Sequence, residues 1–143
     1  MDIKDIGAGS TVYLPVYQSG GLFSAGDGHA VQGDSEVCAT SIETPLRATL
    51  EFQLHKGHAI SGPQVATESE FMTIAFSHTL EEASQRAISY MVEYLTQRRE
   101  LTRYEAYGLL SLAGDLRINQ IVNYPHFGVR MAISKSLFSS WEW

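Results

Sequence analysis

A change of pattern at Thr79 limits the folds that this chain of 143 residues can adopt. Residues 1–76 contain frequent glycines, β-branched residues and short alternations of apolar and polar side chains, which are typical of strands. From Thr79 onward the apolar residues recur at helical spacing. Because strands come first and helices follow, the sequence predicts an α+β fold, with β-sandwich-like N-terminal strands followed by a smaller helix-on-sheet portion containing two helices.

Strands are predicted at four short runs, the last of them a return strand after the helices: 11–14, 48–54, 71–76 and 127–135. In the second run Leu50, Phe52 and Leu54 alternate with polar residues, so they are expected to face a core. The third run is apolar, short and well bounded, which favours a strand over a helix. The first 76 residues are therefore interpreted as the strand-rich part of the chain.

Two capping signals place the helices. A threonine followed three positions later by a glutamate occurs at 79–82 (TLEE) and at 102–105 (TRYE). This is the spacing of a capping box, in which the threonine oxygen accepts a backbone proton and the glutamate reaches back. The second helix is expected to stop at Gly114, since glycine tolerates the left-handed conformation found after helix ends. The helical part is therefore predicted to span residues 79–114.

The composition argues against several classes of partner. A net charge of -6 and a pI near 5.3 provide no basic surface for a phosphate backbone, so no nucleic-acid partner is expected. No apolar run approaches the roughly 20 residues that a membrane-spanning helix needs, and residues 1–5 (MDIKD) lack the order of a signal peptide. We therefore expect no membrane partner and a cytoplasmic location. With one cysteine, Cys38, and no internal repeat or linker, residues 1–143 are predicted to form one domain without disulfides.

Residues 26–36 (GDGHAVQGDSE) hold the densest group of potential ligands and catalytic side chains in the sequence. Side chains two positions apart in an extended strand share a face. Two groups are therefore expected, Asp27 with His29, and Gln32 with Asp34 and Glu36. The three glycines among them allow sharp turns and a close approach of the backbone to a ligand. The run is therefore interpreted as the candidate functional site.

A divalent metal ion is one ligand that this run could hold. Zinc accepts mixed imidazole and carboxylate ligands while leaving a position for water. Asp27, His29 and Asp34 are the predicted ligands, and zinc is the preferred metal, with calcium or manganese as alternatives. Simple turn formation is the other interpretation of the same residues, since aspartate and glycine both favour turns. Cys38 is a further candidate as a nucleophile, although free cysteines are more often packing residues.

The glycine-framed run and the residues after it, 26–38 and 40–45 (TSIETP), resemble the signature of the acetamidase/formamidase family. The resemblance continues on both sides of this signature, at 1–5, at 8–16 (AGSTVYLPV) and at 114–118 (GDLRI). It covers essentially the whole chain. It is similar, however, only to the C-terminal portion of the family, whose members carry a further N-terminal region that also contributes to the active site.

The resemblance implies an amidase that hydrolyses small linear amides, such as formamide or acetamide, to a carboxylate and ammonia. A metal ion in the glycine-framed run would assist by polarising the amide carbonyl and activating a water molecule. Glu36 and Asp34 are the predicted catalytic residues. Glu36 would carry a proton from water to the departing ammonia, because an amide leaving group is poor unless protonated. Ser35 stands between them where the family usually has glycine, which affects the turn. Four more residues are assigned to substrate contact or to support of the site: Asp2, Lys4, Gln32 and Glu43.

A non-catalytic role is the alternative, because the chain begins abruptly at Met1 without the family's N-terminal region. The chain would then be a remnant, or one subunit of a split amidase whose partner chain carries the N-terminal half. An apolar seam left uncovered by that half would favour self-association, so a homo-oligomer is also expected. The expected partner is a small amide substrate in the first case and a complementing chain in the second.

Overall fold

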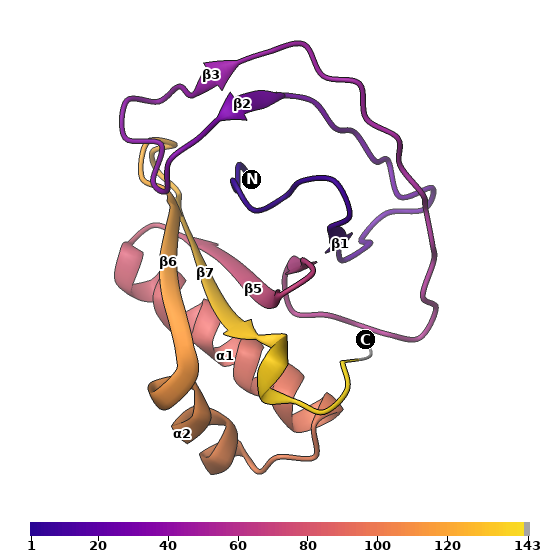
Figure 1. Cartoon of the computed structure of the whole chain (residues 1–143), viewed down its shortest axis with the longest axis vertical. Coiled ribbons are helices and arrows are strands. Elements are labelled where there is room, and N and C mark those ends of the chain that lie inside the picture. Colours follow the sequence, from indigo (N-terminus) through magenta and orange to yellow (C-terminus); the bar gives the residue numbers. More distant parts are fainter. Residues whose placement is uncertain (142–143) are drawn as a thin grey trace.

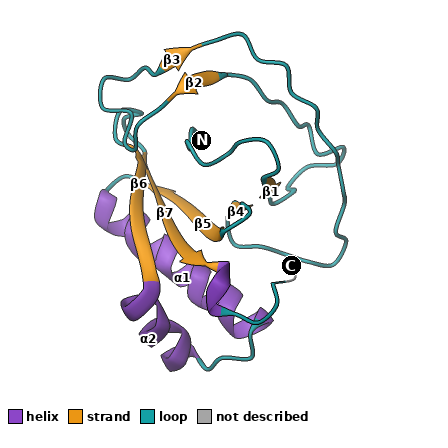
Figure 2. Cartoon of the chain, viewed as in Figure 1, coloured by secondary structure: helices purple, strands orange, loops and turns teal. Residues whose placement is uncertain are grey.

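The computed structural model describes residues 1–141 and confirms the α+β class (Figure 2). Strands come first, two helices follow, and two strands and a short 3-10 helix close the described chain. The elements are β1 Thr11–Tyr13, β2 His29–Val31, β3 Ile42–Glu43, β4 Gln64–Ala66, β5 Glu70–Ser77, α1 Leu80–Arg98, α2 Arg103–Ala113, β6 Gly114–Gln120, β7 Phe127–Ser134 and the 3-10 helix Lys135–Leu137. Both predicted helices and the predicted strands at 11–14, 71–76 and 127–135 are confirmed.

An antiparallel sheet of five strands forms the centre of the molecule, in the order β1-β4-β5-β7-β6. β5 and β7 pair along their full lengths, from Glu70 opposite Ser134 to Ser77 opposite Phe127. β2 and β3 lie outside this sheet and form a separate two-stranded ribbon (Figure 1). The described strands are thus divided between two antiparallel sheets. β4 pairs with the edge of β5 that faces away from β7, and β1 pairs with β4, so both belong to the helix-covered sheet.

Each helix begins after the threonine that the sequence predicts. Thr79 Oγ1 accepts a hydrogen bond from the Glu82 backbone nitrogen (3.1 Å) at the start of α1. At the start of α2, Thr102 and Glu105 form a complete capping box. Within the described residues, neither helix is long and apolar enough to cross a membrane.

The chain passes directly from α2 into β6 at Gly114. The predicted end of the helix at Gly114 is confirmed, but this glycine has φ -98°, so the expected left-handed conformation is wrong. Its missing side chain permits close packing instead, because a Cβ atom there would lie 2.2 Å from Met131 Cε and 2.8 Å from the Leu110 carbonyl oxygen. β6 is an addition to the predicted elements, signalled in the sequence only by the alternation of Leu116 and Ile118 with polar residues.

The larger core lies between the helices and one face of the sheet. Its side chains are 0 to 4% exposed, and burying each large one contributes roughly 1.5 to 3 kcal/mol. The helices supply residues at the spacing that the sequence predicts. The main contributors are Phe71 and Ala75 from β5, Val129, Met131 and Ile133 from β7, Ala83, Ala87, Met91 and Leu95 from α1, and Ala106 and Leu110 from α2.

The opposite face of the sheet is covered by the N-terminal segment, residues 1–6. Ile3 is buried there in a small apolar cluster with Val65, Met72, Ile74 and Ala132. Arg130 of β7 shares this face with Ala132, because alternate residues of a strand point the same way. The site residues described below lie on this side of the sheet.

Two long extended arms, residues 14–28 and 44–58, run between the ribbon and the sheet and form the arch in Figure 1. The strand predicted over 48–54 falls in the second arm, and that prediction is wrong. The alternating pattern is present, but residues 48–54 pair with no strand of the described chain. A strand requires such a backbone partner as well as a suitable pattern.

The alternating side chains of the second arm are uncovered. Leu50 is 52%, Phe52 68% and Leu54 68% exposed. Phe52 meets Phe23 of the first arm edge to face, with ring centroids 5.0 Å apart. The arms therefore present apolar surface to solvent instead of the core that the pattern predicts.

Candidate functional site

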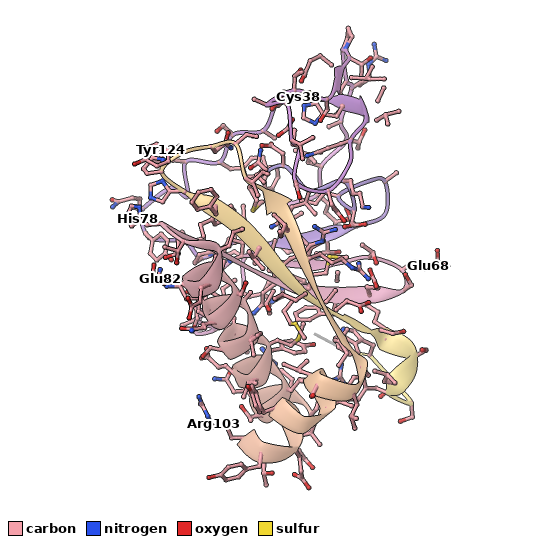
Figure 3. The ribbon with its side chains drawn as sticks, turned by 90° about the vertical axis from the view of Figure 1, so that its left-hand side faces the viewer. Cys38, Glu68, His78, Glu82, Arg103 and Tyr124 are labelled. Atoms are coloured by element: carbon pink, nitrogen blue, oxygen red, sulfur yellow. The ribbon has the colours of Figure 1, made fainter. Side chains whose placement is uncertain are left out.

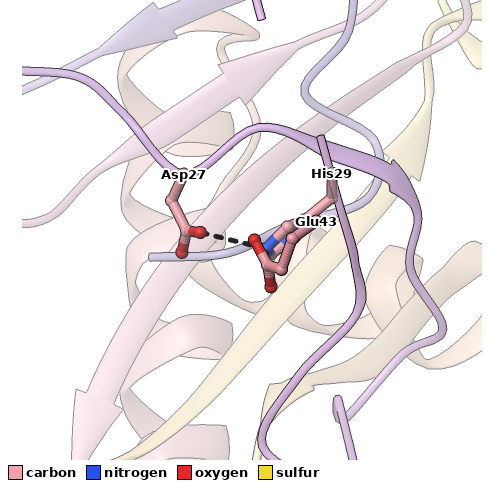
Figure 4. Close-up of side chains that lie close together, drawn as sticks. All are labelled: Asp27, His29 and Glu43. Atoms are coloured by element: carbon pink, nitrogen blue, oxygen red, sulfur yellow. Dashed lines mark ion pairs between the residues drawn. The ribbon is translucent and has the colours of Figure 1, made fainter. Parts of the chain in front are cut away.

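A histidine and two carboxylates converge where β2 pairs with β3 (Figure 4). His29 begins β2 and lies opposite Glu43 of β3. Its Nε2 atom is 3.1 Å from Glu43 Oε1 and 3.2 Å from Asp27 Oδ1. Asp27 reaches this position with φ 63°, a left-handed conformation that aspartate tolerates better than most residues. Three potential metal ligands thus lie within 4.8 Å of one another.

Gln32 fixes the other side of the histidine ring. His29 Nδ1 lies 3.2 Å from Gln32 Oε1, so a neutral ring donates its proton there and keeps a lone pair on Nε2. The bond to Gln32 and the charges of Glu43 and Asp27 raise the pKa of His29 against the opposing effect of burial. Nε2 is buried and makes no well-oriented hydrogen bond within residues 1–141. A cation between Nε2 and the two carboxylates would satisfy it.

Asp34 lies in a different set of contacts, between two cations. Arg130 Nη2 donates a hydrogen bond to Asp34 Oδ1 (2.7 Å), and Lys4 Nζ is 3.2 Å from Asp34 Oδ2. Burial acts to raise the pKa of Asp34, but the hydrogen bonds and charges of Arg130 and Lys4 outweigh it and hold the pKa below its ordinary value. Asp34 therefore stays ionised at neutral pH.

Glu36 is buried and held from two sides. Its carboxylate accepts hydrogen bonds from Gln120 Nε2 (2.8 Å) and Ser41 Oγ (3.0 Å). Gln120 Nε2 also donates to Asp2 Oδ2, so one amide group bridges the carboxylates of Glu36 and Asp2. Gln120 thus connects the end of β6 with both the N-terminal segment and the glycine-framed run.

The turn that carries Glu36 is strained. Ser35 has φ 77° and Glu36 φ 46°, a left-handed pair that costs non-glycine residues about 1 to 2 kcal/mol each. Backbone bonds hold the turn in place: the Ser35 nitrogen donates to the Asn119 carbonyl (3.1 Å), and the Ile121 nitrogen donates to the Ser35 carbonyl (3.2 Å). The positive φ of Ser35 explains why glycine suits this position.

A cavity of about 350 Å³ lies beside this turn, lined by residues 31–34, 36–38 and 40–42. Gln32 connects it to the histidine cluster, because its side chain bonds His29 and it also lines the cavity. Cys38 is on the lining, at the end of the molecule away from Arg103 of α2 (Figure 3). Its thiol is exposed, and Sγ contacts the Thr40 carbonyl at 3.5 Å. That contact supplies no base to activate it as a nucleophile.

Comparison with known proteins decides the family. The acetamidase/formamidase family profile matches residues 1–140. The chain belongs to the acetamidase/formamidase family. Among curated proteins, no match was found.

Solved structures of other family members support this assignment. The chain is similar to an acetamidase from Bacillus halodurans, with 35% identity, a TM-score of 0.77 and coverage of 96% of this chain and 46% of that one. It is also similar to a predicted acetamidase/formamidase from Thermoanaerobacter tengcongensis (31% identity, TM-score 0.90, coverage 96% and 45%). A third is an acetamidase from Yersinia enterocolitica (32% identity, TM-score 0.87, coverage 98% and 42%). The chain spans less than half the length of each.

The predicted site residues of this acetamidase/formamidase chain are divided between two groups. The predicted ligands Asp27 and His29 come together, and Glu43 joins them where Asp34 was expected. The second group contains Asp34 and Glu36 with Asp2 and Lys4 from the N-terminal segment. The alternation of side chains holds only within a strand, and β2 ends at Val31. Residues 32–36 therefore do not share a strand face, and Gln32 contacts His29 while Asp34 and Glu36 lie in the second group.

Five residues of the site lie outside the sequence predictions: Asp5, Ser41, Asn119, Gln120 and Arg130. Arg130 carries the clearest signal, because it is an ionisable residue inside the apolar strand Phe127–Ser134. A charge in such a strand must find buried partners. Asn119 and Gln120 end β6, which was itself not predicted.

Proposed function

We propose that this chain carries a metal-assisted centre for the hydrolysis of small linear amides of the formamide or acetamide kind. The observation that supports it best is the link made by Gln32 between the His29 cluster and the cavity beside Glu36. A cavity of about 350 Å³ is ample for an amide of a few heavy atoms. The family's solved members carry the names acetamidase and formamidase.

The donor set fits a divalent cation. Asp27, His29 and Glu43 offer one imidazole nitrogen and two carboxylate oxygens, a mixture that zinc accepts with a position left open, and calcium or manganese are the alternatives. The buried Nε2 of His29, without a well-oriented bond in residues 1–141, is the atom that most requires such a ligand. When bound, the cation would polarise an amide carbonyl and lower the pKa of a water molecule.

The protein groups supply orientation and proton transfer. Gln32 holds the His29 ring with Nε2 directed at the carboxylates. Glu36 is the proposed proton carrier, taking a proton from water and delivering it to the leaving nitrogen, and Gln120 and Ser41 orient its carboxylate. Asp34 stays anionic between Lys4 and Arg130, and we assign it an electrostatic role beside the cavity.

Metal content and ammonia release test this proposal together. The purified chain would be analysed for bound metal and assayed with formamide and acetamide, alongside Glu36→Gln and a matched control, Glu68→Gln, at the exposed turn between β4 and β5. Loss of the proton carrier should lower kcat by about 10²- to 10⁴-fold, while metal content stays unchanged. The control should behave like wild type. Equal and measurable ammonia release by all three proteins would contradict the assignment of Glu36.

The second candidate is a split amidase that needs a complementing chain, and the exposed apolar arms favour it. The chain spans 42 to 46% of the length of its solved relatives. One arm exposes four large apolar side chains by more than half of their surface: Leu46, Leu50, Phe52 and Leu54. Soluble monomers rarely expose large apolar patches that no partner covers. We propose that a chain resembling the N-terminal half of the relatives covers this arm.

Mixing the chain with the half that it lacks shows whether amide hydrolysis requires a complementing chain. Ammonia release would be measured for the chain alone and after addition of the N-terminal half of the Bacillus halodurans acetamidase, with light scattering on each sample. Activity that appears only in the mixture would support a split enzyme, and a homo-oligomer would show as a larger particle without additions. A fully active monomer would remove the complementing chain from the proposal. A cytoplasmic location is proposed with either outcome.

A further inference from the structure

Arg130 is the largest side chain that is fully buried in the described structure, and it lies under the candidate site. Its guanidinium contacts three polar side chains. Nη2 donates to Asp34 Oδ1 (2.7 Å) and is 2.8 Å from Asp5 Oδ2, while Nη1 donates to Asn119 Oδ1 (2.7 Å). These partners come from the glycine-framed run, the N-terminal segment and β6. One cation therefore joins three segments that are far apart in the sequence.

The contacts constrain the strained turn on both of its sides. Arg130 holds the Asp34 side chain directly. It also holds Asn119, whose backbone carbonyl accepts the Ser35 nitrogen. Two consecutive left-handed residues, Ser35 and Glu36, need such external constraint, because their intrinsic preference is for other conformations.

We propose that Arg130 is the positioning residue of this site, fixing the Asp34–Glu36 turn so that the Glu36 carboxylate lines the cavity. This inference rests on the proposed amidase function. The planar guanidinium donates along several fixed directions at once, so it can hold a carboxylate and an amide oxygen in a defined relation. A lysine in its place would keep the charge but offers a single ammonium on a flexible stem, which cannot hold both groups in that geometry.

The neighbouring strand provides a matched control. Arg117 of β6 lies opposite Arg130 in the register and also forms short ion pairs, but with Glu70 (2.7 Å) and Asp115 (3.0 Å), which are outside the site. Arg130→Lys and Arg117→Lys therefore make the same chemical change on adjacent strands. Only Arg130→Lys removes contacts that hold the Asp34–Glu36 turn.

Two measurements test the proposal, one without turnover and one with it. Amide hydrogen exchange at Ser35 and Ile121 should become about tenfold faster in Arg130→Lys, while exchange in α1 stays at its wild-type rate. In the amide assay, with the complementing half added if it is needed, kcat should fall roughly 10- to 100-fold with KM little changed. Arg117→Lys should change neither quantity.

Exchange and kcat in Arg130→Lys that match those in Arg117→Lys would overturn the proposal. If no amide is hydrolysed under any condition, the proposed function fails while hydrogen exchange still decides whether Arg130 positions the turn. If Arg130→Lys does not fold, Asp34→Ala removes the acceptor of Arg130 Nη2 and so breaks the same contact from the turn side. Unchanged exchange at Ser35 in that variant would equally overturn the inference.

Discussion

The two faces of the central sheet are built by different physical means. The face covered by α1 and α2 is an apolar core in which packing provides most of the stability. The opposite face has a small apolar cluster around Ile3, and beside it Arg130, Asp34, Gln120 and Glu36 are joined by hydrogen bonds and ion pairs. Packing tolerates many sequences, whereas a buried polar network requires each partner. The comparison places the fold's stability on one face and its chemistry on the other.

The largest expected difference is between two phenylalanines. Phe71 is fully buried on the helix-covered face and stacks on Tyr94 at 4.0 Å, whereas Phe52 lies exposed on the second arm. Phe71→Ala should cost about 4 kcal/mol of unfolding free energy, and Phe52→Ala less than about 0.5 kcal/mol. Urea denaturation of both variants measures this. Similar losses would mean that the arm is packed in the isolated chain.

Loss of a buried polar contact should cost more unfolding free energy on the face that carries the candidate site (the site face) than on the helix-covered face. Asn119→Leu leaves Nη1 of the buried Arg130 without its acceptor and should cost about 2 kcal/mol. Thr73→Val on the helix side removes one neutral bond, from Thr73 Oγ1 to the Ala87 carbonyl (2.8 Å), and should cost about 1 kcal/mol. Thermal and urea unfolding of the pair give the comparison. A larger loss in Thr73→Val would contradict the importance of the charged network.

Relief of backbone strain should stabilise the site face. Ser35→Gly places glycine at φ 77° and should raise the unfolding free energy by about 1 kcal/mol, after the entropy of the more flexible unfolded chain is subtracted. Ser69→Gly, between β4 and β5 and outside the left-handed region, is the matched control and should lower stability by a few tenths of a kcal/mol. A loss of stability in Ser35→Gly would show that the turn is not strained.

The helix-covered face was predictable because its signals are local. Thr79 and Thr102 mark helix starts within four residues, and the apolar spacing of α1 specifies the buried side of that helix. The site face was predictable only in part. Asp27 and His29 are two residues apart and were expected together, but the convergence of Glu43 depends on the pairing of β2 with β3.

Three of the remaining site contacts join residues far apart in the sequence: Gln120 with Asp2 (118 positions), Arg130 with Asp34 (96) and Gln120 with Glu36 (84). No periodicity encodes contacts of that kind. The strand predicted at 48–54 was wrong for a related reason. Its pattern is correct for a strand, but a pattern cannot supply the neighbour that a strand must pair with.

Acid should weaken the site face more than the helix-covered face. The folded-state pKa of Asp34 is held below its ordinary value, so its ion pairs contribute stability above pH about 4, and this contribution is lost as pH falls further through the folded pKa. Asp34 is 34% exposed, so solvent screening limits the effect to less than about 1 kcal/mol.

Glu105 at the start of α2 also has a lowered pKa, caused by its bonds to Thr102, but it is fully exposed and should contribute less. Urea midpoints at pH 7 and pH 3 for wild type, Asp34→Asn and Glu105→Gln measure both contributions. The wild-type advantage over Asp34→Asn should shrink at pH 3, and an advantage that persists there would show that Arg130 and Lys4 do not stabilise the ionised carboxylate.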